Sequence, residues 1–93
     1  MTINFDGDLA QIVGIEGAVI YNILEEFKIT KGHPFVITVE ELKKRTRFFT
    51  RQELYRGIRA LVDEEFVDIR GTKVGTVNCY YCHLWDRGWD NDS

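Results

Sequence analysis

Two short sequence patterns constrain the fold of this chain more than any other feature. In both, a threonine stands three residues before a glutamate: Thr38 precedes Glu41, and Thr50 precedes Glu53. In such a capping box, the threonine hydroxyl and the glutamate carboxylate bond each other's backbone N–H groups and begin an α-helix. The patterns therefore predict two short helices that start twelve residues apart, as in a helix-turn-helix.

The length and composition of the chain predict one folded domain. Its 93 residues are 44% hydrophobic, so the chain can bury a core. We expect the domain to span residues 1–85 and the acidic residues 86–93 to form a flexible tail. A domain of this size buries only about 60–65% of the surface of its unfolded chain, so its stability should be modest unless it forms a homodimer.

The sequence shows no sign of export or of membrane insertion. No segment approaches the length of about 18 uninterrupted apolar residues that a membrane span needs. Residues 1–6 lack the basic start and apolar run of a signal peptide. Two cysteines without a secretion signal favour a reducing compartment. We therefore expect a cytoplasmic protein without a membrane partner.

The pattern of apolar residues predicts an α+β fold in the order helix, strand, helix, helix, strand, strand. The first helix has a short segment from Asp8, an interruption at Gly14 and a stronger segment beyond it. The last two strands form a hairpin with its tip near Thr72 and Lys73. This order is that of a winged helix, with the hairpin as the wing. The expected elements are the helical segment Glu16–Phe27, the strand Phe35–Ile37, the helices Val39–Arg45 and Arg51–Glu64, the strand Phe66–Arg70, the turn Gly71–Gly75 and the strand Thr76–Trp85.

The second helix of the predicted helix-turn-helix has one apolar face. Leu54, Ile58, Leu61 and Val62 recur at helical spacing and are expected to face the core. Gly57 lies in the middle of this helix, where glycine costs about 1 kcal/mol relative to alanine. We therefore expect the backbone of another element, or a partner, to approach the helix closely at Gly57.

A block of basic residues coincides with the predicted helix-turn-helix. Residues 43–59 contain seven lysines and arginines and one acid, Glu53, whereas the whole chain has a net charge of −3. Cations clustered on such a unit favour duplex DNA as partner, because arginine can bond guanine and glutamine can address adenine. The alternative is that these charges are solvated and partly paired with Glu40, Glu41 and Asp63. The predicted DNA contacts are Lys43, Lys44, Arg45, Arg47, Arg51, Gln52, Tyr55, Arg56 and Arg59, together with Lys73 on the wing.

Several stretches of the sequence resemble the N-terminal domain of phage replication initiator (replisome organiser) proteins. Val13–Ile20 resembles the entry to the first helix of that domain, and Thr38–Leu42 resembles its Thr-x-Glu-Glu helix start. Phe48–Leu61 matches its turn and recognition helix in spacing, and the apolar strand Phe66–Ile69 follows. The resemblance covers about residues 8–70. It implies a phage-encoded winged helix that binds DNA in the host cytoplasm, in transcription regulation or DNA replication.

The sequence departs from this family in two respects. The family usually ends the recognition helix on glycine, whereas Glu65 stands here, so that turn must form without a residue that tolerates the left-handed conformation. The larger initiators also carry further domains for assembly and helicase loading, whereas this chain ends at Ser93. We therefore expect a small phage-type regulator or accessory protein rather than a complete initiator.

The stretch Cys79–His83 matches the C-x-x-C-H pattern of covalent haem attachment. We reject this interpretation because the stretch is a predicted strand, in which positions 79 and 82 point to opposite faces. A zinc site built from Cys79, Cys82, His83 and the distant His33 has enough ligands, but the same geometry disfavours it. The sequence also lacks a Ser/His/Asp set and a phosphate-binding glycine loop. We therefore expect no enzymatic activity, no cofactor and no metal.

The aromatic residues of the predicted wing support a second interpretation. Alternate residues from Val77 to Trp85 are expected to line one side of the wing, and exposed tyrosine and tryptophan are typical of protein interfaces. The chain would then be a winged-helix protein-interaction module, such as a phage inhibitor of a host enzyme, that uses its acidic surfaces. A homodimer is also expected on the DNA-binding interpretation, because helix-turn-helix domains commonly pair to read two half-sites. The aromatic residues concerned are Tyr80, Tyr81, Trp85 and Trp89.

Overall fold

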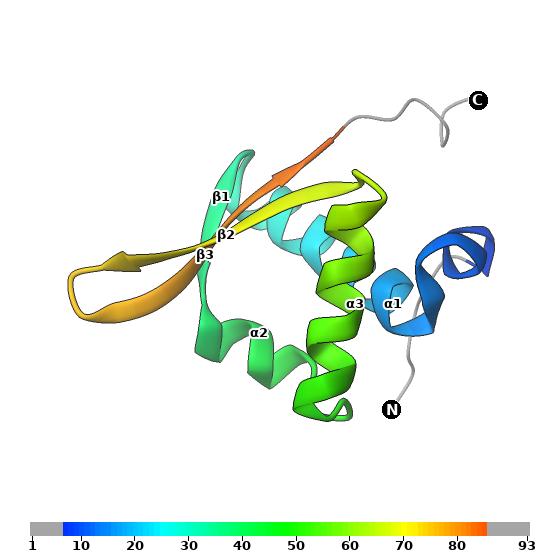
Figure 1. Cartoon of the computed structure of the whole chain (residues 1–93). Coiled ribbons are helices and arrows are strands. Elements are labelled where there is room, and N and C mark those ends of the chain that lie inside the picture. The colour runs from blue at the N-terminus through cyan, green and yellow to red at the C-terminus, as the bar shows by residue number, and fades with distance from the viewer. Residues whose placement is uncertain (1–6, 86–93) are drawn as a thin grey trace.

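A computed structural model describes residues 7–85 as three α-helices and one three-stranded antiparallel sheet (Figure 1). The α+β class predicted from the sequence is confirmed. The predicted tail, residues 86–93, lies outside the described residues, as does the segment 1–6. Among the residues described, no helix is long and apolar enough to cross a membrane. The elements in chain order are α1 (Gly7–Lys31), β1 (Phe35–Thr38), α2 (Val39–Arg45), α3 (Arg51–Asp63), β2 (Val67–Val74) and β3 (Val77–Leu84).

α1 consists of two helical segments that meet at Gly14, where φ is 80° and ψ is 168°. Glycine adopts a positive φ without strain because it has no Cβ atom. The interruption predicted at this residue is confirmed. The second segment continues beyond Phe27, its predicted end, to Lys31, and its apolar residues, among them Ile20 and Leu24, are buried.

α1 and α3 approach each other closely at two glycines. A Cβ atom added to Gly57 of α3 would lie 2.9 Å from the backbone carbonyl carbon of Glu16 and 2.6 Å from the side chain of Ile20. A Cβ atom on Gly17 of α1 would lie 3.5 Å from the carbonyl oxygen of Gly57. The close approach predicted at Gly57 is therefore confirmed, and the element that approaches is α1.

The sheet has the strand order β1-β3-β2, so the last strand lies in the middle. β3 pairs antiparallel with both neighbours: Ile37 lies opposite Tyr80, and Ile69 lies opposite Cys82. The helices lie to one side of the sheet, and the β2–β3 hairpin extends away from them (Figure 1). Each of the three helices and three strands contributes residues to the core between the sheet and the helices. It includes Leu9, Val13, Ile20, Leu24, Ile37, Leu42, Leu54, Leu61, Val67 and Leu84.

The β2–β3 hairpin is longer than the sequence predicts. The predicted turn over Gly71–Gly75 is wrong, because strand pairing continues to Val74 and Val77. The chain turns instead through the two residues between them, Gly75 and Thr76. Gly75 has a φ of 64°, and the tightest hairpin turns need a positive φ of this kind.

This register moves two residues away from their predicted places. Gly71 lies within β2, opposite Tyr80, and is not part of the turn. Lys73 lies opposite Asn78 within the paired part of the hairpin. The tip, predicted near Thr72 and Lys73, lies instead at Gly75 and Thr76. The position of Lys73 brings it closer to the helices than a residue at the tip would be.

α3 ends in a Schellman motif. The Phe66 N–H group donates to the Leu61 carbonyl at 2.9 Å, and the Glu65 N–H group donates to the Val62 carbonyl at 3.0 Å. Glu65 has a φ of 62°, so it takes the left-handed position that glycine usually occupies. Phe66 and Leu61 are both buried, which supplies the apolar contact that accompanies this motif.

The core-facing side of α3 is narrower than the sequence predicts. Leu54, Gly57 and Leu61 are buried, and Ile58 packs partly against the core. Val62 is 36% exposed, so the prediction that it faces the core is wrong. Val62 follows Leu61 and lies about 100° further around the helix, outside the strip that packs on α1.

Candidate functional site

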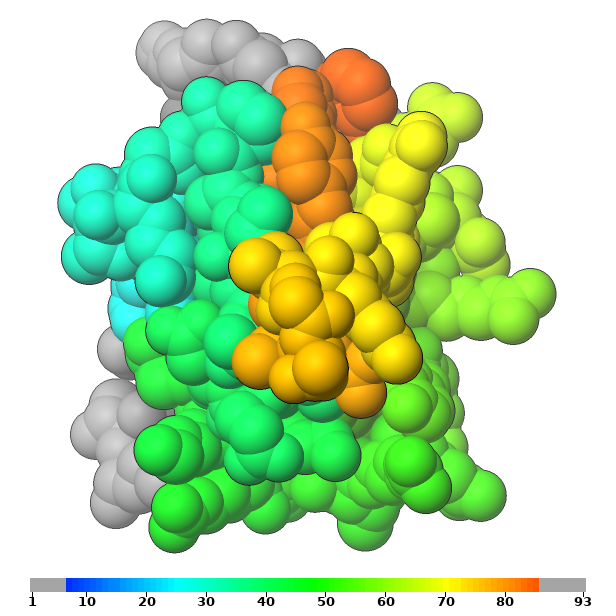
Figure 2. Space-filling model, turned by 90° about the vertical axis from the view of Figure 1, so that its left-hand side faces the viewer, coloured from blue at the N-terminus to red at the C-terminus, as the bar shows by residue number. Residues whose placement is uncertain are grey.

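An open groove lies between α2, α3 and the β2–β3 hairpin. It contains two adjoining cavities of about 320 Å³ and about 490 Å³, and both are lined by Lys43, Arg51, Tyr55 and Tyr80. Seen from the side, the hairpin projects in front of the surface formed by α2 and α3 (Figure 2). Together these cavities form one surface, the basic groove, which is lined by Lys43, Arg47, Arg51, Tyr55, Lys73 and Tyr80.

Local hydrogen bonds fix the start of each helix that borders the basic groove. The Glu53 N–H group donates to Thr50 Oγ1 at 3.1 Å, and the Thr50 N–H group donates to Glu53 Oε1 at 2.7 Å. Thr38 and Glu41 form the same pair of bonds at the start of α2, at 2.9 and 2.8 Å. Both predicted capping boxes are confirmed. Because α3 starts directly after Thr50, Arg51 is its first residue and lies at the mouth of the groove.

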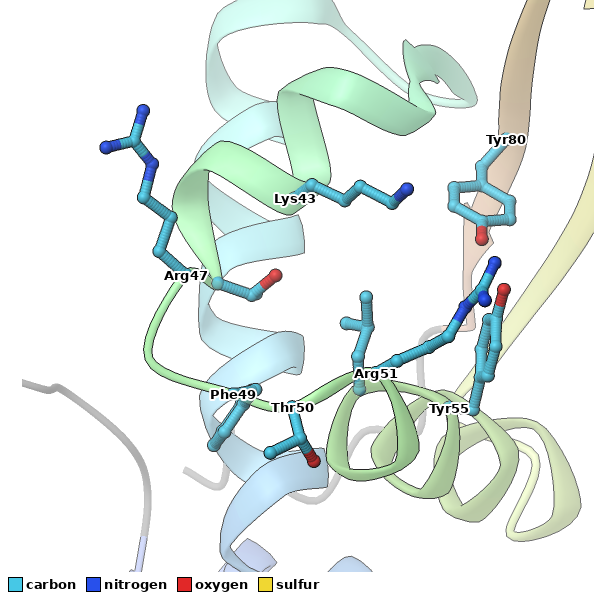
Figure 3. Close-up of a pocket in the computed structure, with 9 residues that line it drawn as sticks. Lys43, Arg47, Phe49, Thr50, Arg51, Tyr55 and Tyr80 are labelled. Atoms are coloured by element: carbon cyan, nitrogen blue, oxygen red, sulfur yellow. The ribbon is translucent and has the colours of Figure 1, made fainter.

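Two tyrosines form the aromatic part of the basic groove. The Arg51 guanidinium lies 5.9 Å from the centroid of the Tyr55 ring, within the range of a cation–π interaction. Tyr80 projects from β3 toward α3, and the side chain of Lys43 points toward it from α2 (Figure 3). Burial raises the pKa of Tyr80 above its ordinary value of 10.0. Like any tyrosine hydroxyl with a pKa of 10 or above, it is protonated at neutral pH and is available as a hydrogen-bond donor.

Within residues 7–85, five of the predicted DNA-contacting cations form no ion pair. All five are exposed. All but Lys44 line the basic groove. Uncompensated cations gathered there create a local positive potential, even though the chain as a whole has a net charge of −3. These residues are Lys43, Lys44, Arg47, Arg51 and Lys73.

Arg45 lies apart from the basic groove. Its guanidinium is hydrogen-bonded to the carboxylate of Glu26 on α1 and lies 5.3 Å from the centroid of the Phe27 ring. These contacts direct Arg45 toward α1. Glu41, expected as a partner of the basic block, instead pairs with Lys31 at 3.4 Å. Glu41 therefore does not neutralise any cation of the basic groove.

Two arginines on α3 are paired with carboxylates. Arg56 Nη1 lies 3.2 Å from Glu16 Oε2 on α1, and Arg59 Nε lies 3.7 Å from Asp63 Oδ2 one turn along α3. The Arg56 and Arg59 side chains are largely exposed, 65% and 82%. Exposed pairs of this kind contribute at most about 1 kcal/mol, so a stronger anionic partner can displace the carboxylates.

The outer side of α3 forms a second surface next to the basic groove. Gln52, Tyr55, Arg56 and Arg59 line a shallow depression of about 520 Å³, with Asp63 among its walls. Tyr55 belongs to this surface and also to the groove. The structure thus brings most of the predicted DNA contacts onto two adjoining surfaces that share one tyrosine.

Tyr80 is a groove residue that the sequence analysis assigned only to the aromatic wing. In β3 it lies on the same side as Cys82 and Leu84, which are buried against the helices. Tyr81, its neighbour, lies on the opposite, open side and is 37% exposed. Counting the strand alternation back from Leu84 would have placed Tyr80 beside the helices.

The residues of the disfavoured zinc site make other contacts. His33 Nε2 accepts a hydrogen bond from the Leu84 N–H group at 2.8 Å, and its ring centroid lies 4.6 Å from that of His83. Burial raises the pKa of the Cys82 thiol to about 12, which disfavours the thiolate that binds metals. The described part of the chain contains no group of three or more potential ligands that could hold a metal ion.

Comparison with models of protein families, with curated proteins and with solved structures found no match to this chain. The resemblance to phage replication initiators therefore stays a prediction from the sequence. The case for a function depends on the shape, charge and aromatic content of the basic groove.

Proposed function

We propose that residues 7–85 form a winged helix that binds duplex DNA, with α3 as the recognition helix and the β2–β3 hairpin as the wing. The order of the elements and the central place of β3 in the sheet support this proposal. So does the short connection of residues 46–50 between α2 and α3. A recognition helix and a neighbouring wing let one domain contact both a groove of DNA and its backbone.

One observation carries the proposal: four cations without ion pairs line the basic groove of an acidic protein. Phosphates of DNA would neutralise these cations and release counterions, which is the main source of affinity in such complexes. The groove therefore favours a polyanion as ligand.

The two surfaces of the site suit the two kinds of contact that DNA offers. Gln52 and Arg59 on the outer side of α3 suit base edges in the major groove, where their side chains can form two hydrogen bonds to one base. Lys43 and Lys73, on opposite walls of the basic groove, suit phosphates. Base specificity would then come from α3, and affinity would come mainly from the groove.

The biological role that we propose follows the sequence resemblance. A phage-encoded domain of this kind would regulate transcription or assist DNA replication in the host cytoplasm. Two copies of the chain would read two half-sites, as helix-turn-helix domains commonly do.

Binding of the purified chain to a pool of random duplexes, measured by gel shift, tests this function. Arg51→Gln and Lys73→Gln should each weaken binding to all sequences. Lys28→Gln is the matched control, because it removes the same charge from an exposed residue of α1 that lines none of the groove cavities. Equal losses for all three variants, or no binding by the natural chain, would exclude the proposed DNA site.

A second candidate function, a protein-interaction module, is favoured by the open side of the sheet. Val36 of β1, Tyr81 of β3 and Trp85 are 40%, 37% and 47% exposed. Exposed apolar and aromatic residues on adjacent strands are typical of protein interfaces. If this function is correct, Tyr81→Ser or Trp85→Ser should abolish capture of a host protein, while Arg51→Gln should not. Trp89, the remaining aromatic residue of this hypothesis, lies outside the described residues.

A further inference from the structure

The basic groove contains more apolar surface than phosphate binding requires. Its smaller cavity is lined by Phe49, Leu54, Tyr55 and Tyr80, in addition to cations and threonines. Lysine and arginine on an open surface are sufficient for a phosphate, which needs charge and N–H donors only. The aromatic and aliphatic lining therefore indicates a ligand with a flat apolar part.

The arrangement of the side chains brings the aromatic rings and the cations of the cavity together. Tyr80 and Tyr55 approach the same space from β3 and from α3, and the Arg51 guanidinium lies close to both (Figure 3). Lys43 points into this space from α2 (Figure 3). A ligand in this space would therefore meet aromatic rings and cations at once.

The size of the cavity restricts the ligand further. A volume of about 320 Å³ is at the lower end of the range for small-molecule sites. A paired base in a duplex is stacked on both faces and cannot enter a hollow between two helices and a hairpin. An unpaired base is free to leave the stack, and aromatic side chains bind such bases by stacking.

We propose that this cavity receives one unpaired nucleotide, whose base stacks on Tyr80 or Tyr55 and whose phosphate contacts Lys43 and Arg51. The proposal rests on the proposed DNA-binding function and names its preferred ligand, a duplex that adjoins an unpaired strand. The outer side of α3 would hold the paired part. The cavity would hold the first nucleotide beyond it.

Fluorescence anisotropy with two labelled DNAs tests the proposal. One is a blunt duplex, and the other is the same duplex with a short unpaired thymidine extension. The natural chain should bind the extended duplex about tenfold more tightly, because one stacked base adds roughly that much. Tyr80→Leu should remove this preference, so that the variant binds the two DNAs with equal affinity.

Tyr81→Leu is the matched control, since it makes the same change one residue further along β3 on the opposite side of the sheet. It should keep the preference. If circular dichroism shows that Tyr80→Leu does not fold, Tyr55→Leu takes its place, because Tyr55 is 50% exposed and contributes little to the core. The readout is then the ratio of its affinities for the two DNAs. Quenching of 2-aminopurine at the first unpaired position on binding of the natural chain gives a readout without mutation.

The outcomes separate this proposal from the proposed function. Binding of both DNAs with equal affinity, or unchanged 2-aminopurine fluorescence, would overturn the nucleotide site while leaving duplex binding intact. A preference that survives both tyrosine changes in the cavity would also overturn it. Binding of neither DNA would overturn both proposals.

Discussion

The guanidinium of Arg56 lies 3.2 Å from the carboxylate of Glu16, so the middle of α3 is bonded to α1 at the edge of the surface proposed to meet DNA. We expect Glu16→Gln to increase duplex affinity by up to about fivefold. The change removes a carboxylate that competes with phosphate for Arg56, and an exposed pair of this kind is worth at most about 1 kcal/mol. Anisotropy titration at low salt measures the change.

Glu26→Gln is the control for the Glu16 prediction. It makes the same change of net charge, but it releases Arg45, which is directed toward α1 and Phe27. Affinity should change much less in this variant. If both variants gain affinity equally, the effect comes from net charge and not from the position of Arg56.

Gly57→Ala should destabilise the fold by about 1–3 kcal/mol, the usual range for a methyl group forced into a packed contact. The added Cβ atom would lie 2.9 Å from the backbone of Glu16, which a side-chain rotation cannot relieve. Urea denaturation followed by circular dichroism measures the loss. Gly71→Ala is the control, because no atom lies within 4 Å of its added Cβ, and its stability should change by less than about 0.5 kcal/mol.

Glu65→Gly should stabilise the fold by about 0.5–1 kcal/mol. Glu65 has a φ of 62°, a conformation that costs a residue with a side chain roughly 1–2 kcal/mol and glycine almost nothing. The greater freedom of glycine in the unfolded chain offsets part of the gain. Glu64→Gly, one residue earlier at a φ of −89°, should destabilise the fold instead. Thermal unfolding of both variants measures the two changes in stability, and a change of the opposite sign in either variant would contradict the prediction.

Acidification should weaken the fold through His33. Desolvation of the ring lowers the pKa of His33 below its ordinary value of 6.5, and the neighbouring His83 and Lys28 lower it further. A group with a lowered pKa in the folded state stabilises the fold above the pKa of the unfolded state, and this stability is lost as the pH falls through the folded pKa. The free energy of unfolding should therefore decrease as the pH falls below about 6.5.

His33→Gln tests the assignment of this pH dependence. The glutamine amide oxygen can still accept a hydrogen bond from the Leu84 N–H group, but it does not titrate. The variant should lose less stability on acidification than the natural chain when both are unfolded by urea across this range. An identical loss in the two proteins would assign the pH dependence to other groups.

The sequence was most informative where structure depends on near neighbours. Both capping boxes and the interruption at Gly14 formed as predicted, because each depends on a few consecutive residues. The close contact at Gly57 was also predicted, because glycine inside a helix has a cost that packing must offset. The identity of the approaching element, α1, required the tertiary structure.

The sequence was less informative where structure depends on distant residues. The hairpin turn was misplaced because Gly71 resembles a turn residue, and only the pairing of β2 with β3 shows that the ladder continues past it. The role of Tyr80 was missed for the same reason, since the side of β3 that faces α3 depends on register. The pairing of Arg45 with Glu26 joins residues nineteen positions apart on different helices.

The salt dependence of duplex binding tests the central claim, that uncompensated cations of the basic groove neutralise DNA phosphates, most directly. With four or five phosphate contacts, a plot of the logarithm of the association constant against the logarithm of salt concentration should have a slope of about −4, since each contact contributes about −0.9. Lys73→Gln should make this slope shallower by about one. A slope near zero for the natural chain, or an unchanged slope in Lys73→Gln, would contradict the claim.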